Sequence, residues 1–565
     1  MAEVDSVPAA AGAPLLPPWS RWDRWLSAAI GALAAVALML LFVHTAVDPE
    51  FWWDESGQYW MSLGQYHLAD TGTAPGPIQD GLWRGRNGWN LDPVGFTVLL
   101  RGWIEIFGSA PVALRALPFM AYMAAFLTGA VMGRRVMRLP WFVSSALSLG
   151  VLGAALPAQY ATELRAYSWE LLGVLVTAWL TVAVLTGLNR RAAAALPVVY
   201  VVFAVCSRYS FVVAVAASCL ALLVAAAAIR SRQLWQALAV AAGGAVVAAV
   251  IVLWNVGIFG GGRQASPGYT DRLELSGSGA GEILGDTLRA NFVSGAQACV
   301  GLFLLAAVGY LTMNRIWGRA VGTAMTQRRQ GAAVLRPWTG ALLVVVAYES
   351  MAMIVSVLGA APWNADYRWS IGLYAVALVA AFGLVSLALE ILGALQSRMT
   401  SEAAHRLRAA LYIASAVGCL LIAIGGSLRM IGFDRIDYQR LGPTLAVIPE
   451  SDRVMVAADY WPSYRMLTET GTSPQSPSIL LGLNPSGQQG PGQEPVMFAG
   501  DADYTATLPV DGGCVRGQTT AVLLPQPPDS LPLTIRAIRA ASRSSGCLVE
   551  VRSGPDGGAV VVVRG

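Results

Sequence analysis

Two adjacent carboxylates, Asp54 and Glu55, lie in the aromatic segment FWWDESGQYW that follows the first long apolar run of the chain. Burying two charges in such a setting costs free energy, so their presence points to chemistry. A carboxylate there can act as general base on an acceptor hydroxyl, and the pair could also hold a divalent cation. The alternative is an interfacial aromatic belt with both acids directed to water, made of Trp52, Trp53, Tyr59 and Trp60.

Arg and Tyr residues recur together at three further places, each at one end of an apolar run. The three segments are QYATELRAYSWELL with Glu163, Arg165 and Tyr167, CSRYSFVV with Arg208 and Tyr209, and PWNADYRWSIGLY with Tyr367 and Arg368. Together with Arg84 and Arg86 of the first loop they could converge on an anionic head group. An acid that activates a hydroxyl, facing Arg residues that hold a departing phosphate, makes a glycosyl-transfer site. Taken singly, each Arg also fits a structural ion pair or a side chain that reaches the membrane interface.

The elements that must position these residues are long apolar segments. Only 13% of the 565 residues are charged, against about 25% in an ordinary soluble domain, which indicates an integral membrane protein. A bilayer-spanning helix needs about 20 apolar residues. We therefore expect a mostly α, polytopic membrane protein with about eleven transmembrane helices, over residues 26–47, 112–133, 141–158, 169–188, 193–206, 209–229, 235–258, 291–313, 338–360, 369–393 and 409–428.

The loops between these segments predict the orientation of the chain. Every second loop is rich in Arg, which is typical of the cytoplasmic side. The expected units are a cytoplasmic tail over residues 1–25, a transmembrane domain over 26–429 and an extracytoplasmic domain over 430–565. The first outer loop covers 48–111, and its segment from Val94 to Phe107 is apolar at near-helical spacing, which predicts a helix along the membrane surface.

The C-terminal region differs in composition from the rest. Its segments RVMVAADYW, TAVLLP, CLVEVRS and GAVVVVRG are strand-like and separated by Pro and Gly, which predicts a soluble domain that is α/β or β-rich. Cys514 and Cys547 lie in this region and could form a disulfide if it faces an oxidising compartment. The other four cysteines lie in apolar runs and are expected to be small buried hydrophobes.

Several of these segments, in order, resemble the landmarks of one family. WDESGQYW is similar to its acidic first-loop motif, and LDPVGFTVLLRGWIEIFGSAPVALRALPFM to the segment that follows. ATELRAYSWELL, SRYSFVV and ADYRWSIGLYAVAL are similar to later landmarks. Over residues 25–395 the chain resembles the GT-C superfamily of polyprenyl-phosphate-sugar-dependent glycosyltransferases, in the branch of protein mannosyltransferases and lipid A aminoarabinose transferases.

The resemblance implies roles for the residues. Asp54 would be the catalytic base, with Glu55 supporting it or helping to hold a cation, and Glu163 would match an acid of the second outer loop. Arg165, Arg208 and Arg368 would contact phosphate or sugar, and the remaining substrate contacts would be Tyr59, Tyr167, Tyr209 and Tyr367. Many relatives have a basic residue or His followed by two prolines where this chain has Asp92, Pro93 and Val94. Arg84 or Arg86 would then take the basic role, and Asp92 could be an extra acid for the acceptor or a metal.

The implied function is that of an inverting glycosyltransferase of a bacterial inner membrane. It would move a sugar from a polyprenyl-phosphate donor to a glycolipid, envelope polysaccharide or protein on the periplasmic face. The alternative is a transporter or flippase of a lipid-linked sugar, which would need polar groups deep in its spans. Glu349 and Glu390 are the main mid-span charges found, which favours surface chemistry. The net charge of +4 gives no reason to expect a nucleic-acid partner.

Overall fold

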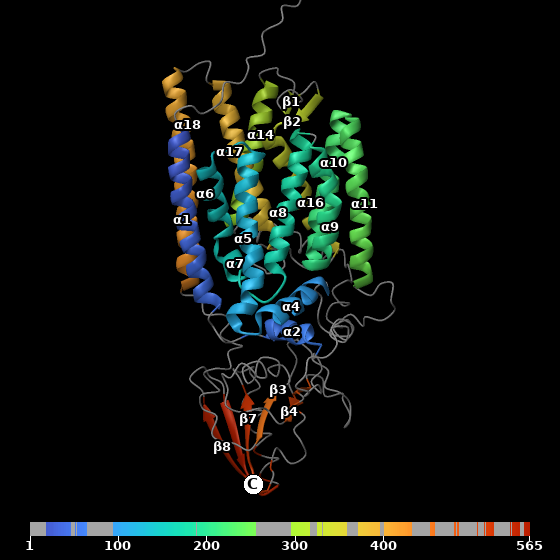
Figure 1. Ribbon diagram of the computed structural model, residues 1–565, viewed down its shortest axis with the longest axis vertical. Coiled ribbons are helices and arrows are strands. Elements are labelled where there is room, and N and C mark those ends of the chain that lie inside the picture. Colours follow the sequence, from blue (N-terminus) through green and yellow to red (C-terminus); the bar gives the residue numbers. More distant parts are fainter. Residues whose placement is uncertain are drawn as a thin grey trace, which may run out of the picture.

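The computed structural model describes two regions of the chain, a helical bundle and a C-terminal sheet (Figure 1). The described residues of the bundle are 19–46, 51, 53–64, 94–187, 189–255, 295–316, 325–329, 332–358, 371–395 and 400–431. Those of the C-terminal region are 453–457, 479–481, 483–484, 505–506, 514, 516–524, 539, 543, 545–553 and 559–565.

Long helices make up the bundle. They are α1 (Trp19–Ala46), α5 (Pro111–Arg135), α6 (Trp141–Leu152), α8 (Tyr167–Gly187), α9 (Arg190–Cys206), α10 (Val212–Ile229), α11 (Arg232–Asn255), α14 (Gly295–Ile316), α16 (Pro337–Leu358), α17 (Gly372–Leu395) and α18 (Ser401–Ile431). Each predicted span overlaps one of them. Among the described residues, nine helices are long and apolar enough to cross a membrane, and the chain is a multi-pass membrane protein.

Two predicted spans are shorter than expected. Helix α9 has 17 residues and begins after Asn189, whose side chain accepts hydrogen bonds from the amides of residues 191 and 192 at 3.0 and 3.2 Å. The predicted span 141–158 is broken: α6 ends at Leu152, and α7 (Ala155–Gln159) continues it after an extended Ala154. The hydroxyl of Tyr122 on α5 donates to the Leu152 carbonyl at 2.6 Å. Because an unsatisfied backbone group is costly in lipid, this bond makes the break tolerable.

The first helix also differs from the prediction, since it begins at Trp19 and not at residue 26. Its first turns are held by Asp23, whose carboxylate accepts from the Phe142 amide at 3.4 Å and from the Ser27 hydroxyl at 3.3 Å. The carboxylate thus serves an amide in the first turn of α6, a role that oxygen side chains commonly fill at helix starts. Contact with α6 therefore extends α1 beyond its apolar run.

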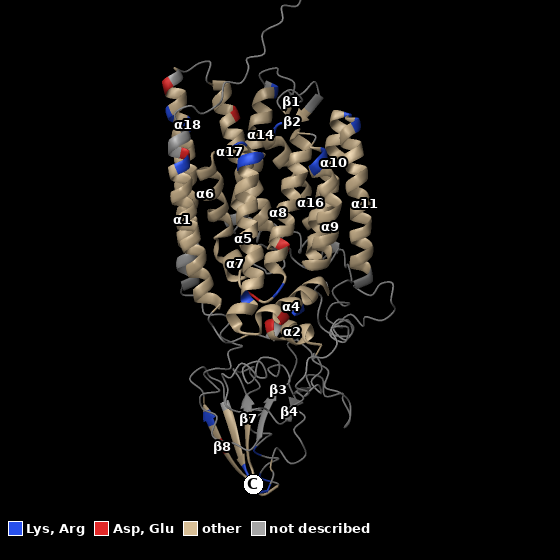
Figure 2. Cartoon of the chain, viewed as in Figure 1, with Lys and Arg blue, Asp and Glu red and all other residues tan. Residues whose placement is uncertain are grey.

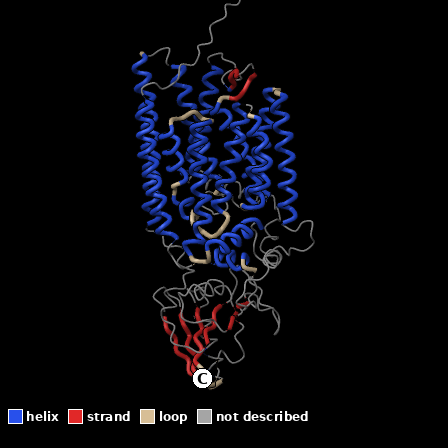
Figure 3. Tube along the Cα trace, viewed as in Figure 1, coloured by secondary structure: helices blue, strands red, loops and turns tan. Residues whose placement is uncertain are grey.

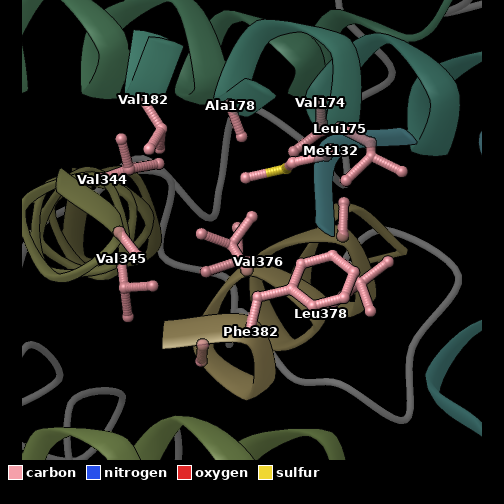
Figure 4. Close-up of a cluster of buried hydrophobic side chains, with 14 of the residues drawn as sticks. Met132, Val174, Leu175, Ala178, Val182, Val344, Val345, Val376, Leu378 and Phe382 are labelled. Atoms are coloured by element: carbon pink, nitrogen blue, oxygen red, sulfur yellow. The ribbon is translucent and has the colours of Figure 1, made fainter. Parts of the chain in front are cut away.

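The interior of the bundle is apolar and tightly packed. Helix α17 is buried along most of its length and contacts α8, α14 and α16, while α5 contacts α6 and α8. Figure 4 shows the side chains between α8, α16 and α17, which include Val174, Ala178, Val344, Val376 and Phe382. Large apolar side chains on the outside are exposed instead, such as Leu305 at 71% and Leu421 at 63%. Such exposure is expected where a helix faces lipid tails.

Two short helices lie across one end of the bundle, α2 (Trp53–Ser62) and α4 (Val94–Phe107) (Figure 1). The bounds of α4 confirm the helix predicted from the sequence. A two-stranded hairpin, β1 (Thr326–Arg329) with β2 (Ala332–Leu335), lies at the opposite end and was not predicted. Charged residues gather at the two ends of the bundle, with few along its length (Figure 2).

A five-stranded sheet lies beyond α2 and α4, at that end of the molecule (Figure 3). Its strand order is β4 (Ile479–Leu481), β3 (Arg453–Ala457), β7 (Thr519–Leu524), β9 (Ala559–Arg564) and β8 (Leu548–Ser553). Strand β3 is parallel to both neighbours, whereas β9 is antiparallel to β7 and β8. A separate pair joins β5 (Leu483–Asn484) to β6 (Thr505–Ala506).

All four predicted strands of this region are confirmed. Cys514 and Cys547, which the sequence left as a possible pair, form a disulfide. The bond closes a separation of 33 residues, with the two Cα atoms 5.8 Å apart. Strand β9, between β7 and β8, is a buried strand of the sheet, because four consecutive residues, Val560–Val563, are all fully buried. Burial of successive residues means that both faces of this strand are covered.

Candidate functional site

The candidate site is built around α2, which is held against the bundle by a small apolar cluster. The cluster joins residues of α2 to α4, to the start of α5 and to the turn over 160–166, and consists of Phe51, Tyr59, Trp60, Leu63, Phe96, Leu100, Leu114, Leu117, Leu164 and Ala166. A buried hydrogen bond adds to it: the Gln58 amide donates to the Thr97 hydroxyl of α4 at 2.8 Å. Helix α2 is therefore a packed element and not an exposed loop.

Glu55 of α2 points into this packing. Its side chain is fully buried, and its Oε1 accepts a hydrogen bond from the backbone amide of Leu164 at 2.8 Å. Its Oε2 lies 3.5 Å from Nη2 of Arg115, which is also fully buried. The sequence prediction placed Glu55 and Glu163 in one site, and the structure puts Glu55 in contact with the residue next to Glu163.

Arg115, in the first turns of α5, is a residue at the site that sequence reasoning did not single out. Besides Glu55 it reaches the carbonyl of Ala46 at the end of α1, with a donor–acceptor distance of 3.4 Å. Its guanidinium also lies 4.3 Å from the centroid of the Phe51 ring. The signal was available, because an Arg inside an apolar run of a membrane protein is a candidate functional residue by itself.

The second and third predicted outer turns also meet. Tyr167, the first residue of α8, is fully buried, and the guanidinium of Arg208 lies 4.5 Å above its ring. Tyr160 packs against the same ring with a centroid distance of 4.7 Å, and Ile371 completes the cluster. An Arg side chain combines contact with an aromatic ring with a planar set of N–H donors whose geometry suits the oxygens of a phosphate.

The other residues of these turns lie around this cluster. Glu163 is buried, and its carbonyl accepts from the Arg165 amide at 2.6 Å, which closes the tight turn before α8. Arg165 is partly exposed. Tyr209 is half-buried and opens the short 3-10 helix η2 (Tyr209–Phe211) that leads into α10. On α2, Tyr59 is buried with its ring 4.9 Å from that of Trp60.

Several predicted residues lie outside what the structure describes. For position 54 the helical backbone is described but the Asp54 side chain is not. Neither the backbone nor the side chain is described for five other predicted residues, Arg84, Arg86, Asp92, Tyr367 and Arg368. The segment of the last two residues leads directly into Ile371, which contacts the Tyr160 and Tyr167 rings.

Charged side chains inside the bundle are few in the described ranges, and three acids stand out. Glu349 on α16 is half-buried, and Glu390 on α17 forms an ion pair with Arg336. Glu170, which sequence reasoning did not single out, is fully buried in the first turn of α8. The positive end of the helix dipole stabilises a carboxylate at that place.

The residues that could hold a divalent cation are described only in part. No group of three or more His, Cys, Asp and Glu side chains comes together among the described residues. Glu55, the described member of the predicted acid pair, directs its oxygens to the Leu164 amide and to Arg115. The predicted cation site pairs Glu55 with Asp54, whose side chain lies outside the described residues, so the metal stays a prediction.

Comparisons with known proteins give a similarity of structure alone. No family model matches the chain, and no curated protein matches its sequence. A crystal structure of ArnT from Cupriavidus metallidurans bound to undecaprenyl phosphate is similar at a TM-score of 0.48 and 13% identity, over 95% of this chain and 98% of that one. The apo structure of the same protein is similar at a TM-score of 0.44 and 13% identity, over 96% and 98%. The argument for function therefore rests on the residues of this chain.

Proposed function

We propose that the protein is a GT-C-type glycosyltransferase that moves a sugar from a polyprenyl-phosphate donor to an extracytoplasmic acceptor. The observation that carries the proposal is that three segments far apart in the sequence meet at one end of the bundle. Glu55 bonds to the turn over 160–166, and Arg208 covers the ring of Tyr167. The sequence analysis predicted that the acids, Arg and Tyr residues of these segments take part in glycosyl transfer.

In the proposed reaction Asp54 acts as general base on the acceptor hydroxyl or amine. The deprotonated acceptor attacks the anomeric carbon directly and the bond to the phosphate breaks, so the configuration inverts. Negative charge develops on the departing polyprenyl phosphate, and preorganised Arg donors stabilise it most in the transition state. Arg208 and Arg165 fill that role, together with Arg368. Asp54 belongs to α2.

The chain path supports placing this end outside a bacterial inner membrane. Helix α5 runs from Pro111, beside the site, to Arg134 and Arg135, and α8 runs from Tyr167 to the start of α9 at Arg190. The basic ends thus lie away from α2, as expected for a cytoplasmic side. The disulfide-bonded sheet lies on the side of α2 (Figure 1), and disulfides persist in oxidising compartments.

The test is transfer of labelled sugar from membrane polyprenyl-phosphate donors by the full-length protein in lipid. Asp54→Asn keeps the size of the side chain and removes its basicity, and should lower turnover by about 100-fold or more, as for loss of a general base, with donor binding retained. Glu105→Gln is the matched control, because this acid on α4 is 62% exposed and pairs only with its helix neighbour among the contacts described. Equal activity of Asp54→Asn and the wild type would place the base elsewhere.

A further inference from the structure

The buried pair of Glu55 and Arg115 joins parts of the molecule that apolar contacts alone would not orient. Glu55 connects α2 to the amide of Leu164, and Arg115 connects α5 to the end of α1 through the Ala46 carbonyl. Both charged side chains are fully buried. The pair and its partners therefore link α1, α2, α5 and the turn over 160–166 in one network.

This pair is not needed to attach α2. The helix already packs through its apolar cluster and through the bond between Gln58 and Thr97. A buried ion pair is a weak source of stability, because the desolvation of both charges offsets their attraction, and apolar residues of similar volume often serve as well. The ion pair and the amide–carboxylate bond are directional, so they select a single orientation of α2, whereas apolar side chains tolerate several orientations.

We infer that Glu55 and Arg115 are positioning residues that fix the rotation of α2 relative to the turn over 160–166. This inference rests on the proposed function, in which α2 carries the base. Leu164, the bonding partner of Glu55, is flanked by Glu163 and Arg165, so the network sets the spacing between position 54 and those two residues. Neither Glu55 nor Arg115 takes part in a bond that forms or breaks.

The experiment compares Glu55→Gln, Arg115→Met, both together, and Arg115→Lys in the full-length protein in lipid. Gln keeps the size of the side chain but removes the negative charge that strengthens the bond from the Leu164 amide, and Met keeps most of the Arg volume. The matched control is Arg406→Met, which removes an Arg from the exposed pair with Glu402 on α18. Three readouts are taken: kcat and donor KM for sugar transfer, thermal unfolding, and hydrogen exchange of the Leu164 amide and of residues 53–62.

A single substitution removes the opposite charge that lies 3.5 Å from the remaining buried charge, so both single variants should expose α2 and lower kcat. The double variant removes both charges and should recover thermal stability and protection of residues 53–62. Its kcat should stay about 100-fold low with donor KM changed less than about threefold, since a displacement of 1 Å costs a factor of this size. Its Leu164 amide should exchange faster than in the wild type, and Arg115→Lys should lie between the wild type and Arg115→Met in kcat.

Two results would overturn the inference. If the double variant regains wild-type kcat, or if its Leu164 amide stays as protected as in the wild type, the pair is a packing feature only. Failure of the proposed function is a separate result, seen as absence of transfer by the wild type itself. In that case the exchange of the Leu164 amide in the double variant still decides whether the pair orients α2.

Discussion

Removal of the disulfide should loosen the C-terminal sheet and leave the helical bundle intact. The bond joins Cys514, which precedes β7, to Cys547, which precedes β8 directly, so it ties together two strands that are not neighbours in the sheet. Without it, the closure entropy of a segment of 33 residues must be overcome on folding. In the chain-entropy relation this segment corresponds to about 12.5 cal/mol/K, or about 3.7 kcal/mol at 25 °C.

Hydrogen exchange on the full chain measures this loss where it occurs. A decrease of about 3.7 kcal/mol in the local free energy of opening corresponds to on the order of 400-fold faster exchange, at about 1.4 kcal/mol for each factor of ten. We expect this change in the amides of β7, β8 and β9 when Cys514 and Cys547 are both replaced by Ser. Helices α5 and α8 should exchange as in the wild type.

The control is Cys206→Ser, which changes a cysteine that is unpaired in the described structure, at the end of α9. It should leave exchange in the sheet unchanged. The reasoning would be refuted if the Ser variant lacking the disulfide exchanged in β7–β9 at the wild-type rate. It would also be refuted if α5 and α8 lost as much protection as the sheet, because the bond would then stabilise the whole chain.

Three further predictions concern packing, the site and pH. Gly150→Ala should lower the free energy of unfolding by about 1–3 kcal/mol, because an added Cβ would lie 2.8 Å from the backbone of α18. Gly418→Ala on α18 is the control, since its added Cβ would meet open space. Thermal unfolding compares the two variants. Tyr167→Leu should lower sugar transfer by about 30-fold through loss of a buried cation–π contact of about 2 kcal/mol, and Tyr167→Phe should retain most of it. The hydrogen bond from Arg552 lowers the pKa of Glu550 below its ordinary 4.5, so the stability it contributes is present above pH 4.5 and lost as the pH falls through the lowered pKa. Acid unfolding of Glu550→Gln should lack this component.

Much of the architecture follows from local patterns. Apolar runs of about 20 residues predicted where the spanning helices lie, because lipid demands such runs. The helix Val94–Phe107 and the strands of the C-terminal sheet were predicted with nearly the observed bounds. The end of α6 was not, since it depends on Tyr122 of another helix, which satisfies the freed carbonyl of Leu152. The start of α1 was not either, because contact between Asp23 and α6 extends it.

For the candidate site, the sequence by itself determined which types of residue are available and at which helix ends they lie. Acids beside aromatic residues and repeated Arg–Tyr clusters can be recognised in the sequence without a structure. Only the tertiary structure decided their partners: Glu55 bonds to a residue 109 positions away and pairs with Arg115, and Tyr167 lies beneath Arg208. The physical reason is that a buried charge is stable only beside its counter-charge or donor, and distance along the chain does not reveal which helices will pack together.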